Sequence, residues 1–256
     1  MPRSAEQTEE LANAATHGLG CLLALAAWPA LAGAPATPHP AALSSSHGLT
    51  QLGSTVFVLT MLLMFLVSAA YHAAPVGATR QRLRRLDHAV IFIFIAGSCT
   101  PFVIGPGAIA LGASGADAGW PDAIGFGAIS PDVGGPARAW PVAVGWPATP
   151  WLTLGAVWLV AVTGMLLKLT NRLRRPLLST GLYLAFGWLA AAAAWPALGQ
   201  LNSAALGLVV GGGLAYSLGS AFYLLGHRMR WAHLVWHVFV LLGCACHFLA
   251  LWISGR

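Results

Sequence analysis

The segment LTQLGSTVFVLTMLLMFLVSAAYHA, residues 49–73, contains no Asp, Glu, Lys or Arg. An α-helix needs roughly 20 predominantly apolar residues to cross a hydrocarbon core about 30 Å thick. We therefore predict that this segment is a membrane-spanning helix. Six further segments are similarly apolar, at about 14–32, 88–106, 149–169, 177–195, 203–226 and 231–253. The sequence thus predicts an all-α, polytopic membrane protein, a single domain built as a bundle of seven transmembrane helices.

The overall composition agrees with this class. Of the 256 residues, 57% are hydrophobic and 8% are charged, and the mean hydropathy is +0.73. Soluble domains carry about 25% charged residues, so an ordinary cytosolic fold, a disordered chain and a nucleic-acid-binding domain are excluded. The formal net charge is +6, but 13 basic residues are sparse in this chain. We expect membrane lipids as partners and no nucleic acid. The four cysteines lie in apolar segments and indicate no disulfide framework.

The basic residues predict the orientation of the bundle. All except Arg138 and Arg256 fall on one side of the predicted spans: Arg3, Arg80, Arg82, Arg84, Arg85, Lys168, Arg172, Arg174, Arg175, Arg228 and Arg230. Cytoplasmic loops collect Lys and Arg, so we expect the N-terminus inside and the C-terminus outside. The Gly- and Pro-rich connection 107–148 is then a long outer loop.

The start of the chain bears on the first span. Three acidic residues, Glu6, Glu9 and Glu10, precede it, and no cleavage-site pattern follows it. A signal peptide begins with a basic region and ends at such a site. We therefore interpret 14–32 as a retained membrane helix.

Ionisable side chains inside a membrane are costly and often functional. In the predicted topology, His72 ends the second span, while Asp87 and His88 open the third. His233 and His237 open the seventh span, so all five lie in the inner leaflet. Residues from helices distant in the sequence are thus predicted to meet at one depth.

His233 and His237 are four residues apart, which places both imidazoles on one helix face. Such a pair alone also occurs as a hydrogen-bonded couple. With His72 it makes three imidazoles, the ligand set of a catalytic Zn²⁺ site with one open position. Asp87 would either ligate directly or hold the metal-bound water and take its proton. Ser68, one turn before His72, would donate a hydrogen bond to a developing oxyanion or orient a ligand.

The remaining histidines receive other interpretations. His17, in the same leaflet on the first span, is expected to support the ligands without binding the metal. His88 would cap a helix start or bind a lipid phosphate. His247 lies ten residues beyond His237, about 15 Å along the helix, so a structural hydrogen bond is expected for it. His39, His47 and His227 are expected in solvated loops.

Several of these residues stand in motifs that resemble a known family. The motifs are Ser68-Ala-Ala-Tyr-His72, Asp87-His88-x-x-Ile91-Phe92, Ile95-Ala96-Gly97-x-x-Thr100-Pro101-Phe102, and His233-x-x-x-His237-Val-Phe-Val-x-x-Gly243-x-x-x-His247-Phe248. In this order they resemble the conserved blocks of the hemolysin III family, the bacterial branch of the progestin and adiponectin receptor superfamily. The resemblance covers nearly the whole chain.

The resemblance implies a seven-helix bundle with its N-terminus inside, in a cell (inner) membrane. It also implies Zn²⁺ held by His72, His233 and His237, with Asp87 acting through water and Ser68 nearby. Alkaline ceramidases of the wider superfamily hydrolyse lipid amides with a similar site. The connection 107–148 is longer than the family pattern leads us to expect.

Three functions follow as hypotheses. The first is a zinc-dependent hydrolase that cleaves a lipid amide or ester. The second, suggested by the family name, is a cytolytic or channel-forming protein. The third is a receptor or membrane-homeostasis sensor in which zinc is structural.

Overall fold

The computed structural model describes residues 4–32, 43–105, 150–226 and 228–254, and all regular secondary structure in these ranges is helical. Seven of the helices are long and apolar enough to cross a membrane, which confirms the predicted class. A single short helix, α7, joins two of them. The helices are α1 (Ala5–Ala32), α2 (Leu43–Ala73), α3 (Ala78–Ile104), α5 (Pro150–Leu169), α6 (Pro176–Ala193), α7 (Trp195–Leu198), α8 (Ser203–Leu225) and α9 (Ala232–Ser254). The predicted outer loop 107–148 lies outside the described residues.

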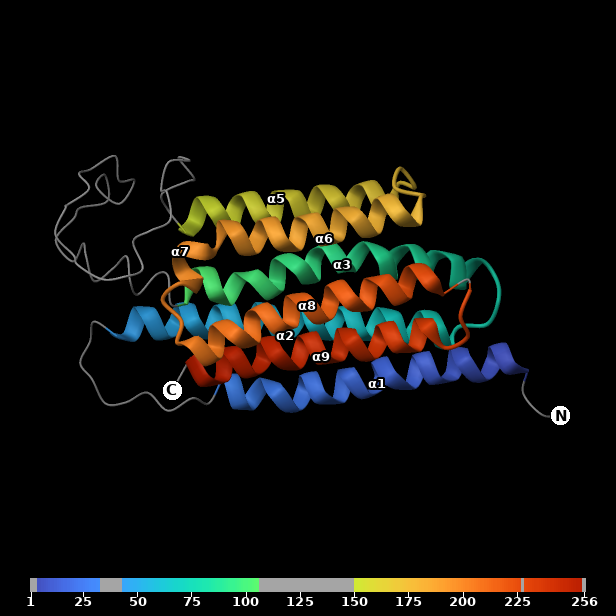
Figure 1. Cartoon of the computed structure of the whole chain (residues 1–256), viewed down its shortest axis with the longest axis horizontal. Coiled ribbons are helices and arrows are strands. Elements are labelled where there is room, and N and C mark those ends of the chain that lie inside the picture. Colours follow the sequence, from blue (N-terminus) through green and yellow to red (C-terminus); the bar gives the residue numbers. More distant parts are fainter. Residues whose placement is uncertain (1–3, 33–42, 106–149, 227, 255–256) are drawn as a thin grey trace.

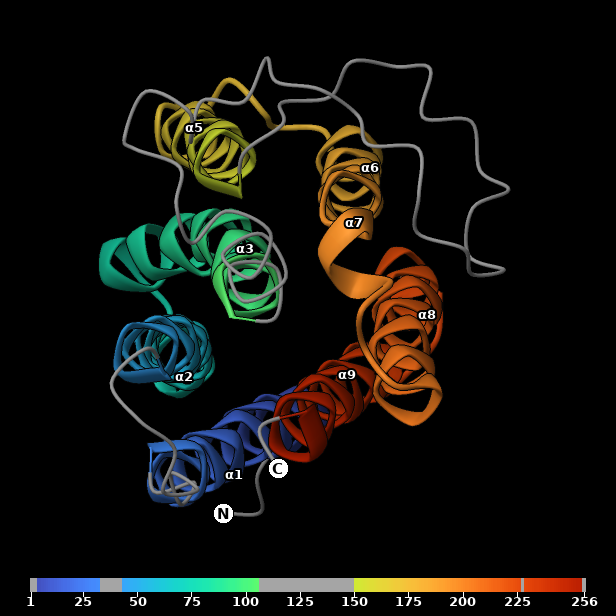
Figure 2. The same ribbon diagram turned by 90° about the vertical axis from the view of Figure 1, so that its left-hand side faces the viewer.

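The long helices run roughly parallel to one axis, and α1 begins at the opposite end of the bundle from the end of α9 (Figure 1). Seen along that axis, the long helices other than α5 form a ring (Figure 2). Its order is α1, α2, α3, α6, α8 and α9, and α1 and α9 pack together to close it. Helix α5 packs outside this ring, chiefly against α3.

Helix α3 is the most enclosed element. In its most apolar window 72% of the residues are buried, whereas the corresponding share is 17% for α5 and 22% for α1. The poorly buried helices expose many large apolar side chains, such as Leu22 and Leu159. Such a surface fits contact with lipid tails, which solvate apolar side chains and remove any need to bury them. The enclosed helix α3 carries Asp87 and His88.

The first three long helices, α1, α2 and α3, begin earlier than the apolar runs indicate. Helix α1 begins at Ala5, not near residue 14, because Ser4 and Gln7 form a reciprocal cap. The Ser4 backbone N–H donates to the Gln7 side chain at 2.9 Å, and the Gln7 backbone N–H donates to the Ser4 hydroxyl at 3.2 Å. This capping box satisfies N–H groups that a helix start leaves unpaired. It places Glu9 and Glu10 on the helix.

Helix α3 begins at Ala78, not at residue 88. The four arginines from Arg80 to Arg85, expected in a loop, therefore lie in its first turns. His88 lies well inside the helix, so the expectation that it caps a helix start is wrong. His47, expected in a loop, lies within α2, while His39 and His227 lie outside the described residues.

Small residues allow α2 and α3 to pack closely, as is common between membrane helices. A Cβ atom at Gly53 would lie 2.7 Å from the Cα atom of Pro101 in α3. Because that neighbour is backbone, it cannot rotate away. At Gly48, in the same helix, a Cβ would meet no described atom within 4 Å.

We predict that Gly53→Ala lowers the stability of the purified protein by about 1–3 kcal/mol, the usual range for overpacking. Gly48→Ala is the matched control, since both changes carry the same gain in helix propensity. It should leave the thermal midpoint unchanged or raise it. The measurement is thermal unfolding in detergent. Equal midpoints for the two variants would show that α2 and α3 do not pack closely at Gly53.

Candidate metal centre

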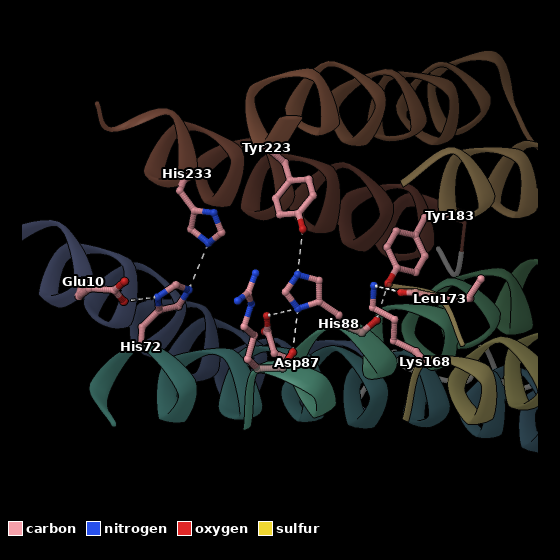
Figure 3. Close-up of polar contacts among 10 residues, drawn as sticks. Glu10, His72, Asp87, His88, Lys168, Leu173, Tyr183, Tyr223 and His233 are labelled. Carbon is pink, nitrogen blue, oxygen red and sulfur yellow. Dashed lines mark hydrogen bonds and ion pairs between the residues drawn. The ribbon is translucent and has the colours of Figure 1, made fainter. Parts of the chain in front are cut away.

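Three histidines from two helices meet at one end of the bundle. His72 lies in the last turn of α2, and His233 and His237 lie in the first two turns of α9. One ring nitrogen from each lies within 4.8 Å of the other two. The Nε2 atoms of His72 and His233 are 3.2 Å apart (Figure 3). Two nitrogen ligands bound at roughly 2.0–2.1 Å to a tetrahedral ion are separated by about 3.3 Å, so this pair is already at ligand spacing.

The hydrogen bonding of His237 tests whether the cluster suits a metal. Its side chain is 0% exposed, and neither ring nitrogen has a hydrogen-bond partner of ordinary geometry among the described residues. A buried polar group without a partner costs about 1–3 kcal/mol. A metal ion bound through the lone pair of one ring nitrogen would remove that cost at this atom. The three imidazoles therefore fit a metal ion.

Asp87 lies beside this cluster without joining it. Its carboxylate is buried, with Oδ2 3.4 Å from His88 Nδ1, and it interacts with Ser68 and with His72. Among the described residues, it is not one of the groups whose ligand atoms lie within 4.8 Å of one another. Ser68 is also buried, one turn before His72 on α2. Asp87 and Ser68 thus lie beside His72, and Asp87 is not part of the ligand set.

His17 supports the cluster from α1. Its ring stacks on the ring of His237, with centroids 3.7 Å apart and an angle of 16° between the planes. His17 is buried and also makes an edge-on contact with Phe65, with ring centroids 5.2 Å apart. It therefore limits how far the His237 ring can turn.

His88 connects helices at the inner side of the ring. Its Nδ1 donates to the Arg84 carbonyl oxygen at 2.8 Å, and its Nε2 is 2.9 Å from the Tyr223 hydroxyl of α8. The Tyr183 hydroxyl of α6 donates to the His88 carbonyl oxygen at 2.7 Å. His88 and its backbone thus join α3 to α6 and α8 (Figure 3). His247 lies further along α9, outside the histidine cluster. Its Nε2 atom is 3.2 Å from the Val209 carbonyl oxygen of α8.

Two residues of this region were not identified from the sequence. Glu10 accepts a hydrogen bond from His72 Nδ1 at 2.7 Å and pairs with Arg80 at 2.5 Å. Glu9, next to it on α1, accepts from the Trp231 backbone N–H at 3.2 Å. The Ser4-x-x-Gln7 pattern could have revealed them, because it extends the first helix back to these acidic residues.

A cavity of about 390 Å³ lies inside the ring and reaches this region. At one end it is lined by His17, Asp87 and His88, and at the other by Trp195 and Leu198. Most of the remaining lining is apolar and comes from α3, α6, α8 and α9. Its volume lies within the range of small-molecule sites, about 300–1,000 Å³. An apolar ligand in this cavity would have one end beside the Asp87 carboxylate.

The fold and the site together define a class of protein: a seven-helix, multi-pass membrane protein with buried imidazoles where its first, second and last helices meet. The sequence profile of the family described as "Haemolysin-III related" matches residues 5–248. The chain belongs to this family, which is part of the progestin and adiponectin receptor superfamily, and the resemblance found in the sequence is confirmed.

Two relatives cover nearly the whole chain. The hemolysin-3 homolog of Bacillus subtilis (strain 168) is 31% identical over 242 residues, which is 94% of this chain and 91% of the relative. Hemolysin-3 of Bacillus cereus is 28% identical over 243 residues, 94% of this chain and 89% of the relative.

A metal bound only by the folded cluster must stabilise the protein. We predict that Zn²⁺ at about 100 times its Kd raises the unfolding free energy by about 2.7 kcal/mol. His237→Ala should abolish this increase. His247→Gln, which keeps a donor for the Val209 carbonyl and lies outside the cluster, should retain it. The measurement is thermal unfolding of chelator-treated protein with and without added metal. Stabilisation that persists in His237→Ala would place the metal elsewhere.

Proposed function

We propose that this protein is a zinc-dependent hydrolase that cleaves an amide or ester of a membrane lipid. The observation that carries the proposal is the juxtaposition of two features: three imidazoles whose ligand nitrogens lie within 4.8 Å of one another, and an apolar cavity that has Asp87 in its wall. A lipid acyl chain fits the chemistry of such a cavity. Its carbonyl group would then lie at the polar end, near the histidines.

The choice of zinc rests on the ligands. Three neutral imidazoles with room for one further ligand are typical of catalytic zinc sites. When bound, zinc supplies a Lewis acid that polarises a carbonyl group and makes water nucleophilic near neutral pH. His72, His233 and His237 would hold it.

The neighbouring side chains would carry out the remaining steps. Asp87, outside the ligand set but adjacent to it, would accept the proton of the attacking water and return it to the leaving group. Ser68, beside Asp87, would donate a hydrogen bond to the substrate carbonyl oxygen or hold the carboxylate in place. His17 would keep the His237 ring in its ligating orientation by stacking on it. The cavity would bind the acyl chain and exclude bulk water.

We predict about one zinc ion per chain in the purified protein and release of fatty acid from lipid amides or esters. His237→Ala should lose both. Asp87→Asn should keep the zinc but lose about 100-fold or more of the activity, because general-base catalysis contributes on that scale. The measurements are metal analysis and fatty-acid release on the same preparations. A folded wild-type protein that takes up no zinc would refute the proposal.

The names of the two relatives favour a second candidate function, lysis of membranes. Leakage of dye from vesicles at low protein density, unchanged in His237→Ala, would support lysis and not hydrolysis. A third result, stoichiometric zinc with no hydrolysis of any lipid class and an altered lipid composition in a deletion strain, would support a sensor with structural zinc.

We also propose that the histidine cluster lies near the cytoplasmic face of the cell (inner) membrane. The distribution of Lys and Arg supports this orientation. A tag placed before Ser4 should be protected from protease in sealed cells, and a tag placed after Ser254 should be cleaved. The reverse pattern would put the cluster at the outer face.

A further inference from the structure

Glu10 is a carboxylate that hydrogen-bonds directly to a histidine of the cluster. Its Oε2 atom lies 2.7 Å from His72 Nδ1, and the His72 side chain is 2% exposed. A carboxylate can only accept a hydrogen bond, so the Nδ1 atom of His72 must carry the proton. In the neutral ring, the Nε2 atom then has a free lone pair. That atom is the one that faces His233 (Figure 3).

Glu10 is itself held by a second contact. Its other oxygen pairs with Arg80, in the first turn of α3. The Arg80 guanidinium also donates to the Ala74 carbonyl oxygen and lies over the Tyr71 ring. These contacts place the carboxylate between the end of α2 and the start of α3, where the His72 ring projects.

The position of Glu10 on α1 adds a further restraint. Glu10, Asn13 and His17 follow one another at helical spacing, and Asn13 and His17 are 2% and 3% exposed. The three therefore lie on the face of α1 that packs into the bundle. Along this face, Glu10 contacts His72 and His17 stacks on His237. One helix thus contacts two of the three imidazoles.

We infer that Glu10 is a positioning residue: it fixes the His72 ring by hydrogen bonding to Nδ1 and so directs Nε2 toward the shared metal position. This inference rests on the proposed zinc site, but not on the proposed hydrolysis. A carboxylate bound to the second nitrogen of a metal-ligating imidazole fixes the tautomer and makes the ligand more basic. Loss of such a partner typically weakens metal binding by about 10–100-fold.

The test is the zinc affinity of the full-length protein, measured by competition with a chelator of known affinity. Glu10→Ala should bind zinc about 10–100-fold more weakly than wild type. Glu10→Gln keeps an oxygen acceptor without the charge and should recover part of the loss. Glu6→Gln is the control, since it removes the same charge from an exposed position in the first turn of α1. Its affinity should equal that of wild type.

A second variant separates positioning from a purely structural role. Arg80→Met removes the ion pair with Glu10 but leaves the contact between Glu10 and His72. It should lower the thermal midpoint, while its zinc affinity stays within about threefold of wild type. In protein loaded with Co²⁺, Glu10→Ala should shift the visible absorption bands, because the donor strength of one imidazole changes. Arg80→Met should not shift them.

Each outcome has a definite meaning. Equal zinc affinity and equal Co²⁺ spectra for wild type and Glu10→Ala would overturn the inference while leaving the zinc site intact. Equal losses of affinity in Glu10→Ala and Arg80→Met would also overturn it, because Glu10 would then act only by joining helices. A folded wild-type protein without measurable zinc affinity would overturn both this inference and the proposed function. Zinc binding without hydrolysis would overturn only the latter.

Discussion

The burial of imidazole nitrogen in an apolar bundle is the constraint on which the rest of the site depends. A polar atom enclosed without a partner is costly, and in a membrane there is little water to compensate it. His237 is the extreme case, because it is fully buried, has no hydrogen-bond partner of ordinary geometry among the described residues and is stacked on His17. Its two neighbours in the cluster, His72 and His233, already lie at ligand spacing. The packing of α1, α2 and α9 therefore holds the ring nitrogens of the three clustered histidines close together.

Much of this arrangement follows from the sequence, because the length of the apolar runs and the spacing of the histidines determine it. Apolar runs long enough to cross a bilayer identify the seven spans, and helical spacing puts His233 and His237 on one face. The depth of each residue in its span then brings His72 to the same level. Depth and spacing do not give the distance between helices, however. The Nε2 atoms of His72 and His233 lie 3.2 Å apart, while Asp87 stays outside the ligand set. Both results depend on how the helices pack against one another, which the sequence of one span does not show.

The helix starts and Glu10 could not be obtained in the same way. Hydropathy shows where a helix lies in lipid, not where its backbone hydrogen bonding begins. Ser4 and Gln7 start α1 by capping, well before its apolar run, and charged residues occupy the first turns of α3. In the sequence alone, the acidic residues before the first span show no link to the histidines. The contact between Glu10 and His72 joins positions 62 residues apart and became visible only once the bundle was assembled.

The cavity and the histidine cluster draw on different helices. Helix α6 forms one wall of the cavity with residues such as Leu184 and Gly187, but contributes no histidine to the cluster. It packs only lightly on its neighbours in the ring and exposes much of its surface. Substitutions on the inner face of α6 would change the length and width of the cavity. They would leave the imidazoles, which lie on other helices, in place. The dimensions of the cavity can thus change through α6 while the histidine cluster, which lies on α2 and α9, stays as it is.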